Sequence, residues 1–170
     1  GNCNPAFLLG WGNSFTYKDF SFYFLIDGHF GGDVLAQTQA VLDQTGVSKV
    51  SGEARTMGYV DLEGHHIYNI KGFYEQVGGR NGVTDYMYDA TNIRLRELSL
   101  GYTLPKRLLG RKQFLKKAEL SFVARNLFFI YKKAPFDPDA VLSASNSNQG
   151  IDIFGIPTTR SVGFNVKLSF

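Results

Sequence analysis

The sequence is poor in cysteine and in long apolar runs, and these two scarcities exclude several kinds of protein. Its single cysteine, Cys3, cannot form a disulfide within the chain, so the fold does not depend on a disulfide framework. No stretch of about 20 consecutive apolar residues occurs, which excludes a transmembrane helix. A membrane-spanning β-strand needs only about 10 residues of alternating polarity, so the second scarcity is compatible with a β-barrel.

The chain also lacks the residue spacings of common catalytic and nucleic-acid-binding sites. No glycine-rich phosphate loop or dinucleotide fingerprint is present, and Cys3 and the three histidines show no nucleophile–base spacing. The net charge is only +3, and the basic residues do not gather on one helix or stripe, apart from a run at residues 104–117. We therefore expect neither an enzyme nor a nucleic-acid-binding protein, and no cofactor.

Aromatic residues and glycine are, in contrast, plentiful. The 170 residues include 15 Phe, 9 Tyr and 19 Gly, and this length suits one domain. Aromatic side chains favour strands and glycine favours tight turns, so the composition predicts β-structure rather than a helical bundle.

Residues 161–170 alternate strictly between apolar and small or polar side chains. The five even-numbered positions are all apolar: Val162, Phe164, Val166, Leu168 and Phe170. Successive side chains of a strand point to opposite faces, so the stretch predicts a strand with one apolar and one polar face. A strand that ends on an aromatic residue favours a barrel in lipid, where aromatic side chains lie at the membrane interface.

A hairpin is predicted for residues 6–30. Apolar residues occupy odd positions up to Tyr17 and even positions from Phe20 onward. Such a change of phase is what a two-residue turn at Lys18 and Asp19 requires, because it places all the apolar side chains on one face. The expected pairs are Tyr17 with Phe20, Phe15 with Phe22, and Trp11 with Ile26.

One short helix is predicted in the connection that follows the hairpin. Asp33 is the expected N-cap, apolar residues recur at helical spacing from Val34 to Leu42, and Gly46 is expected at the C′ position. Residues 47–85 show no clear periodicity, and a connection of this length is usually functional or mobile.

Two further strands are predicted at residues 86–103 and 118–130. In the first, the parity of the apolar residues changes at Arg96 and Glu97. A β-bulge there would place both charges on the polar face and keep the apolar face continuous, whereas the alternative is a strand end.

The strand directions divide the connections into two groups. Lys18, Asp19, residues 104–117 and the C-terminus are expected at one edge of the sheet, and residues 31–85 and 131–158 at the other. Long and short connections segregate in this way in bacterial outer-membrane barrels. The 104–117 connection is basic, which predicts a solvated turn or, alternatively, contact with an acidic surface. Its basic residues are Lys106, Arg107, Arg111, Lys112, Lys116 and Lys117.

Two polar clusters are candidates for metal binding. His65 and His66 could seed a zinc site, but adjacent histidines in a strand or loop point apart, so we expect no metal there. Asp137 and Asp139, with Asn146 and Asn148 nearby, offer oxygen ligands for calcium. They lack the alternating ligand loop of a calcium site, so turn formation is the preferred interpretation.

Tyr86 and Tyr88 are candidates for stacking on sugars, although an aromatic girdle is a simpler interpretation of both. Together with His65 and His66 they are the residues proposed for ligand binding.

Four stretches of the sequence share one family resemblance. Residues 92–105 resemble the C-terminal barrel strands of SusC/RagA-type TonB-dependent outer-membrane transporters, with the sequence NIRLRELSLGYTLP. Three further stretches resemble the same family in the same order. They are residues 46–55 (GVSKVSGEAR), 125–139 (RNLFFIYKKAPFDPD) and 150–170 (GIDIFGIPTTRSVGFNVKLSF).

The resemblance implies an all-β fold in the outer membrane. Residues 1–170 would be antiparallel strands of the C-terminal part of a large transmembrane β-barrel of about 22 strands, with one short loop helix. The plug, the TonB-contacting segment and the remaining strands would lie elsewhere in the protein. The implied function is TonB-dependent import of glycans or peptides together with a SusD-like surface lipoprotein.

The resemblance also implies that the last strand carries the signal read by the barrel-assembly machinery. The residues that would carry this signal are Gly163, Phe164, Leu168 and Phe170.

A soluble β-sandwich that binds carbohydrate is the alternative fold and function. Five alternating strands and many aromatic residues are compatible with it. Burial distinguishes the two folds, because a sandwich covers the apolar faces of two sheets with each other. A barrel wall is instead one sheet with an uncovered apolar band.

Overall fold

The computed structural model describes residues 1–79, 83–105, 115–140 and 149–170, which divide between two structural units. The first, here called the sheet unit, comprises Pro5–Gly31, Thr91–Pro135 and Thr158–Phe170. The second, the helical unit, comprises Gly1–Asn4, Gly32–Ala90 and Phe136–Pro157. Each unit is therefore assembled from three separate stretches of the sequence.

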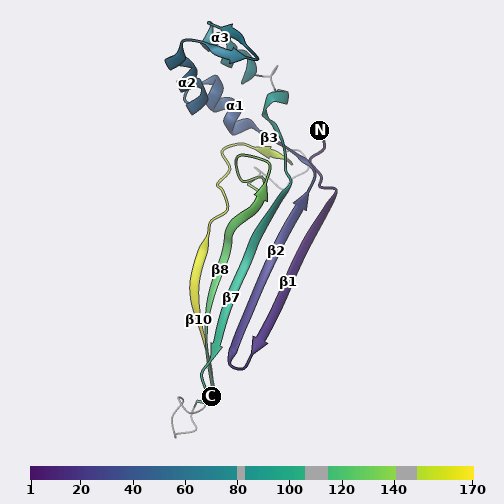
Figure 1. The fold of residues 1–170 in the computed structure, drawn as a ribbon, viewed down its shortest axis with the longest axis vertical. Helices are drawn as coiled ribbons and strands as arrows, with labels where there is room; N and C mark the ends of the chain where they lie inside the picture. Colours follow the sequence, from purple (N-terminus) through teal and green to yellow (C-terminus); the bar gives the residue numbers. More distant parts are fainter. Residues whose placement is uncertain (80–82, 106–114, 141–148) are drawn as a thin grey trace. The chain divides into compact units, whose positions relative to one another are not determined.

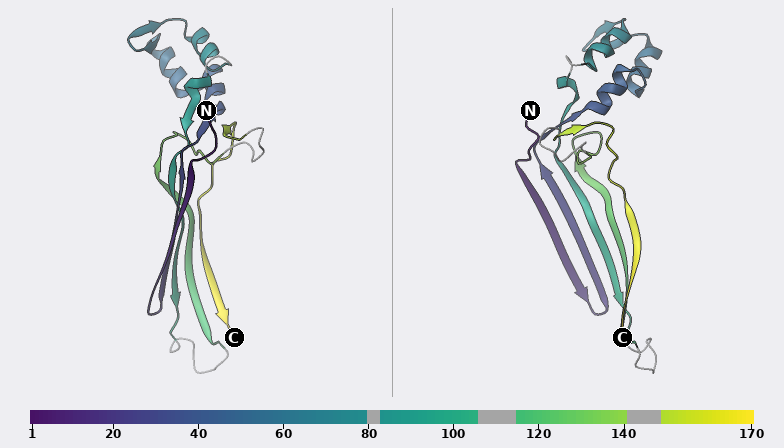
Figure 2. Two further views of the ribbon diagram at one scale, coloured as in Figure 1. Left: turned by 90° about the vertical axis from the view of Figure 1, so that its right-hand side faces the viewer. Right: turned by 180° about the vertical axis from the view of Figure 1, so that it is seen from behind.

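The sheet unit is a single sheet of five long strands (Figure 1). The order across the sheet is β1-β2-β7-β8-β10, and each neighbouring pair is antiparallel. Two further views also show the five strands in one layer (Figure 2). The antiparallel all-β fold predicted from the sequence is therefore confirmed. The strands are β1 (Phe7–Tyr17), β2 (Phe20–Phe30), β7 (Asn92–Thr103), β8 (Lys117–Lys132) and β10 (Ser161–Ser169).

The first hairpin has the predicted turn and the predicted register. Lys18 and Asp19 connect β1 to β2, and Lys18 adopts a left-handed φ of 54°. The change of parity at the turn is sufficient to set this register, because a slip by one residue would turn every apolar side chain to the other face. The predicted pairs are all present: Tyr17 with Phe20, Phe15 with Phe22, and Trp11 with Ile26.

The predicted bulge is also present, on β7. Leu25 lies opposite Glu97 and Ile26 lies opposite Leu95, so Arg96 is the extra residue. The apolar side chains on both sides of the bulge therefore stay on one face. The predicted strand over residues 86–103 is interrupted before β7, where Met87–Asp89 form the separate strand β6.

The strand ends of the sheet unit gather at two edges, as the topology predicts. The backbone N–H of Thr103 donates to Asp19 O (2.8 Å), and that of Lys116 donates to Ser169 O (2.7 Å). The turn between β1 and β2, the end of β7, the start of β8 and the end of β10 therefore share one edge. Four of the six basic residues of the 104–117 connection lie outside the described residues: Lys106, Arg107, Arg111 and Lys112.

The described part of the helical unit combines three α-helices and a 3-10 helix with short strands. Its small core consists of Ala36, Ala40 and Tyr86, against which Val77 and Phe136 pack. The strands form a three-stranded sheet of order β6-β3-β9 and a hairpin of β4 and β5. None of the helices in the described residues is long and apolar enough to cross a membrane. In chain order the elements are β3 (Asp33–Ala36), α1 (Gln37–Gln44), α2 (Lys49–Met57), β4 (Val60–Leu62), β5 (His65–Ile67), α3 (Ile70–Val77), the 3-10 helix η1 (Val83–Tyr86), β6 (Met87–Asp89) and β9 (Ile151–Asp152).

The start of the predicted helix is wrong, and its end is right. Asp33 is not an N-cap but the first residue of β3, and α1 begins at Gln37 without a side-chain cap. Pairing with distant strands overrides the helical pattern, since Asp33 lies opposite Asp89 and Leu35 lies opposite Ile151. Gly46 follows the C-cap with the left-handed φ of 74° that the C′ position requires.

Residues 47–79 contain two helices that the apolar pattern did not predict. The side chain of Ser48 caps α2 by accepting from Ser51 N–H (3.1 Å), and Asn69 caps α3 by accepting from Gly72 N–H (3.1 Å). Each helix has only eight or nine residues, which is too short for a clear apolar period. The capping residues are thus the stronger local signal here.

Candidate functional site

One face of the sheet unit carries an apolar band across all five strands. Residues that lie opposite each other in an antiparallel pair point to the same face, so the registers define rows. The bulge at Arg96 keeps the rows of β7 in phase with those of its neighbours. One row is Phe15, Phe22, Leu100, Phe122 and Phe164; the next is Tyr17, Phe20, Tyr102, Leu120 and Val166.

This apolar band is uncovered. Phe15 is 53% exposed, Leu100 50% and Phe164 75%, although large apolar side chains in a folded protein usually pack against a second layer. A contiguous exposed band of this kind marks a surface that meets lipid or another protein. The single sheet with exposed apolar residues also contradicts the β-sandwich, whose two inner faces cover each other.

The opposite face carries mainly small, polar and charged side chains, with a few apolar ones such as Tyr23, Leu25 and Val123 among them. Such a face suits the water-filled interior of a barrel, where lumen-facing positions alternate with lipid-facing ones along each strand. One row of this polar face is Thr16, Ser21, Gly101, Ser121 and Asn165.

A network of charges lies on the polar face around the bulge. Arg96 donates from Nε to Asp27 Oδ2 (3.2 Å) and from Nη1 to Asn126 Oδ1 (3.3 Å). Beside it, Arg125 Nε lies 3.5 Å from Glu97 Oε2. The side chains of Arg96 and Asp27 are more than a third exposed, so each ion pair contributes little stability by itself. Their arrangement instead links β2, β7 and β8 across the bulge.

Arg94 is the most buried charge of this face, at 1% exposure. Its Nη1 donates to Thr158 Oγ1 (2.8 Å), and its guanidinium lies 4.1 Å from the centre of the Phe129 ring. A guanidinium tolerates such a site because it is weakly hydrated and stacks on aromatic rings. Arg94 was not predicted as a site residue, although a charge at a polar-face position of an apolar strand is a usable signal.

Of the predicted ligand-binding residues, Tyr86 and Tyr88 belong to the core of the helical unit. Tyr86 is 3% exposed and donates its hydroxyl to Asp43 Oδ2 (3.0 Å). Burial, followed by the hydrogen bond to Asp43, raises the pKa of Tyr86 above its usual value. Tyr88 donates to Gln39 Oε1 (3.0 Å) and packs edge-on against Phe136. In this structure Tyr86 therefore offers no ring face to solvent.

His65 and His66 lie on the exposed strand β5 of the small hairpin. The His66 ring stacks on Tyr59 with 4.0 Å between ring centres, and Tyr68 meets Tyr59 edge-on at 6.5 Å. An exposed aromatic group is thus present around His66. Within the described ranges, no three His, Cys, Asp or Glu residues are grouped so that they could hold a metal ion.

The candidate calcium ligands are only partly described. The N–H of Asp139 donates to Asp137 Oδ1 (3.1 Å), as in a turn stabilised by an aspartate side chain. Asn146 and Asn148 lie outside the described residues.

The residues proposed for the assembly signal lie on or directly after β10, and all four are exposed. Phe164 packs edge-on against Phe122 of β8 at 5.5 Å between ring centres. Phe164 and Leu168 belong to the apolar face, and Gly163 belongs to the polar face, opposite Val123.

Comparison with known proteins identifies relatives over nearly the whole chain. No family model matches. TonB-dependent receptor P3 of Formosa agariphila is 29% identical over 175 residues, which cover 98% of this chain and 17% of that protein. TonB-dependent receptor P39 of the same organism is 25% identical over 180 residues, covering 98% of this chain and 16% of that protein. Both are named as receptors, and neither is named as an enzyme.

Solved structures share the fold. Structures of the RagAB peptide importer in its open-open and closed-closed states match with TM-scores of 0.71 and 0.73, at 17% sequence identity. The matches cover 99% of this chain and 17% and 18% of those chains. The chain is therefore similar over nearly its whole length to one part of TonB-dependent receptors, and it spans about a sixth of the length of the curated relatives it matches.

Proposed function

We propose that the sheet unit is part of the barrel wall of a TonB-dependent nutrient transporter, in its C-terminal region. The observation that carries this proposal is the two-faced sheet, with an uncovered apolar band on one side and small, polar and charged residues on the other. Lipid covers the band and the aqueous interior faces the polar side, so both faces have a solvent that suits them. The similarity to TonB-dependent receptors supports the same role.

In this proposal the chain contributes no chemistry. It separates lipid from the transport path, and the Arg96 network keeps the bulged strands in place on the interior side. The TonB complex supplies the energy through other parts of the protein, and residues 1–170 serve as one barrel segment with its connections.

The proposed substrate is a glycan or a peptide, delivered by a SusD-like surface lipoprotein. This part of the proposal rests on the family resemblance and on the likeness in fold to a peptide importer. Purification of the complete protein from its own outer membrane should recover a lipoprotein partner in equal amounts. Recovery of the transporter alone from mildly solubilised membranes would argue against the partner.

The wall role is tested by placing a charge on each face at neighbouring positions of β7. Leu100 lies on the apolar face, opposite Phe22 and Phe122, and Ser99 lies on the polar face. Leu100→Lys should destabilise the membrane-inserted protein by about 2–4 kcal/mol near the bilayer centre and less near an interface. Ser99→Lys should change the stability little, because its side chain stays in water.

The measurement is the fraction of complete protein that is folded in lipid vesicles over a urea series. Equal destabilisation by the two substitutions would contradict the assignment of the faces. A larger effect of Ser99→Lys would reverse it.

A further inference from the structure

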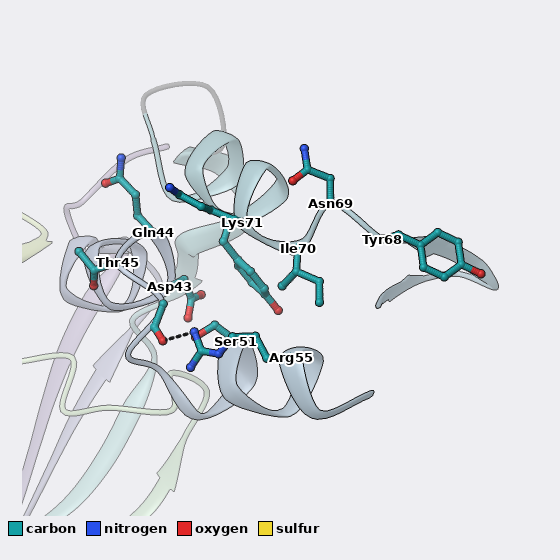
Figure 3. Close-up of a pocket in the computed structure, with 11 residues that line it drawn as sticks. Asp43, Gln44, Thr45, Ser51, Arg55, Tyr68, Asn69, Ile70 and Lys71 are labelled. Carbon is teal, nitrogen blue, oxygen red and sulfur yellow. Dashed lines mark hydrogen bonds between the residues drawn. The ribbon is translucent and has the colours of Figure 1, made fainter. Parts of the chain in front are cut away.

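The three helices of the helical unit border a cavity of about 460 Å³. Cavities that bind small molecules usually measure about 300–1,000 Å³. The C-terminal end of α1, the exposed start of α3 and one face of α2 form its walls (Figure 3). Asp43, Ser51, Arg55 and Ile70 turn toward one another between the helices, and Tyr68 lies at the edge.

Asp43 gives this cavity a buried carboxylate with unused capacity. The residue is 5% exposed, and its Oδ2 accepts from Tyr86. Its Oδ1 is buried and has no hydrogen-bond partner among the described residues. An unpaired buried acceptor is unfavourable, so a ligand that donates to it gains affinity.

Tyr74 offers a second polar group in the same cavity. It is 7% exposed, and its hydroxyl has no hydrogen-bond partner in the part of the chain that the structure describes. Burial, followed by the nearby Asp43 carboxylate, raises the pKa of Tyr74. The phenol therefore stays protonated at neutral pH and can both donate and accept.

The charged side chains around the cavity are of both signs. Arg55 Nη1 donates to Gly46 O (2.6 Å), three residues after Asp43, so a cation and an anion lie at the same end. Lys71 lies near Glu75 at the surface, at 3.7 Å. Hydroxyl groups complement both side chains, because they can donate to Asp43 and accept from Arg55.

An aromatic group continues from the edge of the cavity. Tyr68 lines the cavity, is 75% exposed and contacts Tyr59, on which His66 stacks. Exposed aromatic rings with a polar edge supply flat apolar area at low entropy cost. The apolar face of a sugar ring can pack on such a surface while its hydroxyls reach polar side chains.

We propose that this cavity binds one unit of a neutral saccharide, with the following unit on Tyr68. Asp43 and Tyr74 hold hydroxyl groups of the bound unit, and Arg55 donates to its oxygens. All residues of this site belong to the helical unit, and binding there does not require that transport occurs.

The test is direct binding to the complete protein in a detergent without a sugar headgroup. The probes are four disaccharides: maltose, cellobiose, lactose and xylobiose. Dialanine, a dipeptide with a charged group at each end, represents the alternative class of ligand. Binding is measured by saturation-transfer NMR and calorimetry. Tyr74→Phe removes a hydroxyl that has no hydrogen-bond partner among the described residues, so it should preserve folding and weaken saccharide binding about tenfold. Tyr17→Phe, at a 70% exposed position of the sheet unit, is the matched control outside the cavity and should leave binding unchanged.

Tyr68→Ala is a second test variant. Tyr68 is exposed, so its loss should weaken disaccharide binding without affecting folding. The proposal is wrong if none of the four disaccharides binds, if the Tyr74→Phe and Tyr17→Phe proteins bind them equally well, or if dialanine binds in their place. Transport is not measured in this experiment, so a failure here is separate from a failure of the wall role.

Discussion

Tyr86 and Tyr88 are two positions apart, and their hydroxyls have different partners. Tyr86 donates to the carboxylate of Asp43, and Tyr88 donates to the neutral amide of Gln39, both at 3.0 Å. Hydrogen bonds to charged groups contribute about 1.5–3 kcal/mol, and those between neutral groups about 0.5–1.5 kcal/mol. The two tyrosines therefore form a natural comparison within one small core.

Tyr86→Phe should lower the free energy of unfolding of the helical unit by about 2 kcal/mol, and Tyr88→Phe by about 1 kcal/mol. The larger loss follows because Asp43 then keeps its buried charge without a donor. Hydrogen exchange of the α1 backbone amides, followed by mass spectrometry, measures both losses. Equal losses of unfolding free energy would show that the hydrogen bond to the Asp43 carboxylate is no stronger than the one to the Gln39 amide.

The same pair has a pH dependence with a defined sign. The pKa of Tyr86 is raised in the folded protein, above the value of about 10 for an unfolded chain. The stabilisation is therefore complete below pH about 10 and is lost as the pH rises from there toward the folded pKa. Tyr86→Phe should remove this alkaline loss, and Tyr88→Phe should retain it.

Among the elements, α2 and α3 show how capping residues define helices in a stretch without apolar periodicity. Ser48 and Asn69 each accept a backbone N–H of the first turn, and Gly58 ends α2 with a left-handed φ of 84°. An unsatisfied N–H at a helix start is unfavourable, so a polar side chain at that point favours helix formation.

Ser48→Ala should destabilise α2 by about 1 kcal/mol, because it removes the oxygen that accepts from Ser51 N–H. Thr56→Ala is the control within the same helix. Its hydroxyl bonds back to Gly52 O (3.1 Å), and alanine has the higher helix propensity, so the change should be neutral or slightly stabilising. Hydrogen exchange of the α2 amides measures the stability of the helix in both variants. A greater loss of helix stability in Thr56→Ala than in Ser48→Ala would contradict the role of Ser48 as the cap.

The bulge on β7 allows two successive charged residues to occur in a strand that has one apolar face. Two successive charges, Arg96 and Glu97, would otherwise put one side chain on the exposed apolar band. The extra residue at Arg96 directs it to Asp27 and Asn126, and Glu97 to Arg125. Asn126 accommodates the distortion on β8 with a φ of 51°, which asparagine tolerates better than most residues.

For the whole molecule, β10 is the element whose proposed role depends on the rest of the protein. Its apolar residues are exposed, with Val162 at 62% and Phe164 at 75%, and it pairs only with β8 among the described strands. The unpaired edge of β10 is free to join another strand of a larger barrel. We propose that Phe164 and Phe170 also serve the recognition step of barrel assembly.

Phe164→Ala combined with Phe170→Ala should therefore reduce the amount of complete protein in the outer membrane several-fold. The control is Asn165→Ala with Lys167→Ala, two polar-face positions on the same strand, which should assemble normally. The measurement is the folded band of outer-membrane fractions on gels run without heating. Normal assembly of the phenylalanine variant would remove the proposed signal.

The strands could be predicted in register because the information for them is local. An alternation of period two defines the two faces, and the change of parity at Lys18 and at Arg96 defines the turn and the bulge. The family resemblance then supplied the membrane setting of the exposed face. The helix start at Asp33 could not be predicted, because its strand partners lie more than fifty residues away in the sequence.

Residues 161–170 alone thus specify a two-faced strand, since alternating side chains point to opposite sides of any strand. The cavity depends on tertiary contacts instead. Asp43 and Tyr86 meet across 43 positions of sequence, and Tyr74 joins them from a third element. Burial decides what these polar side chains do, because it removes their water and leaves only the partners that the fold brings together.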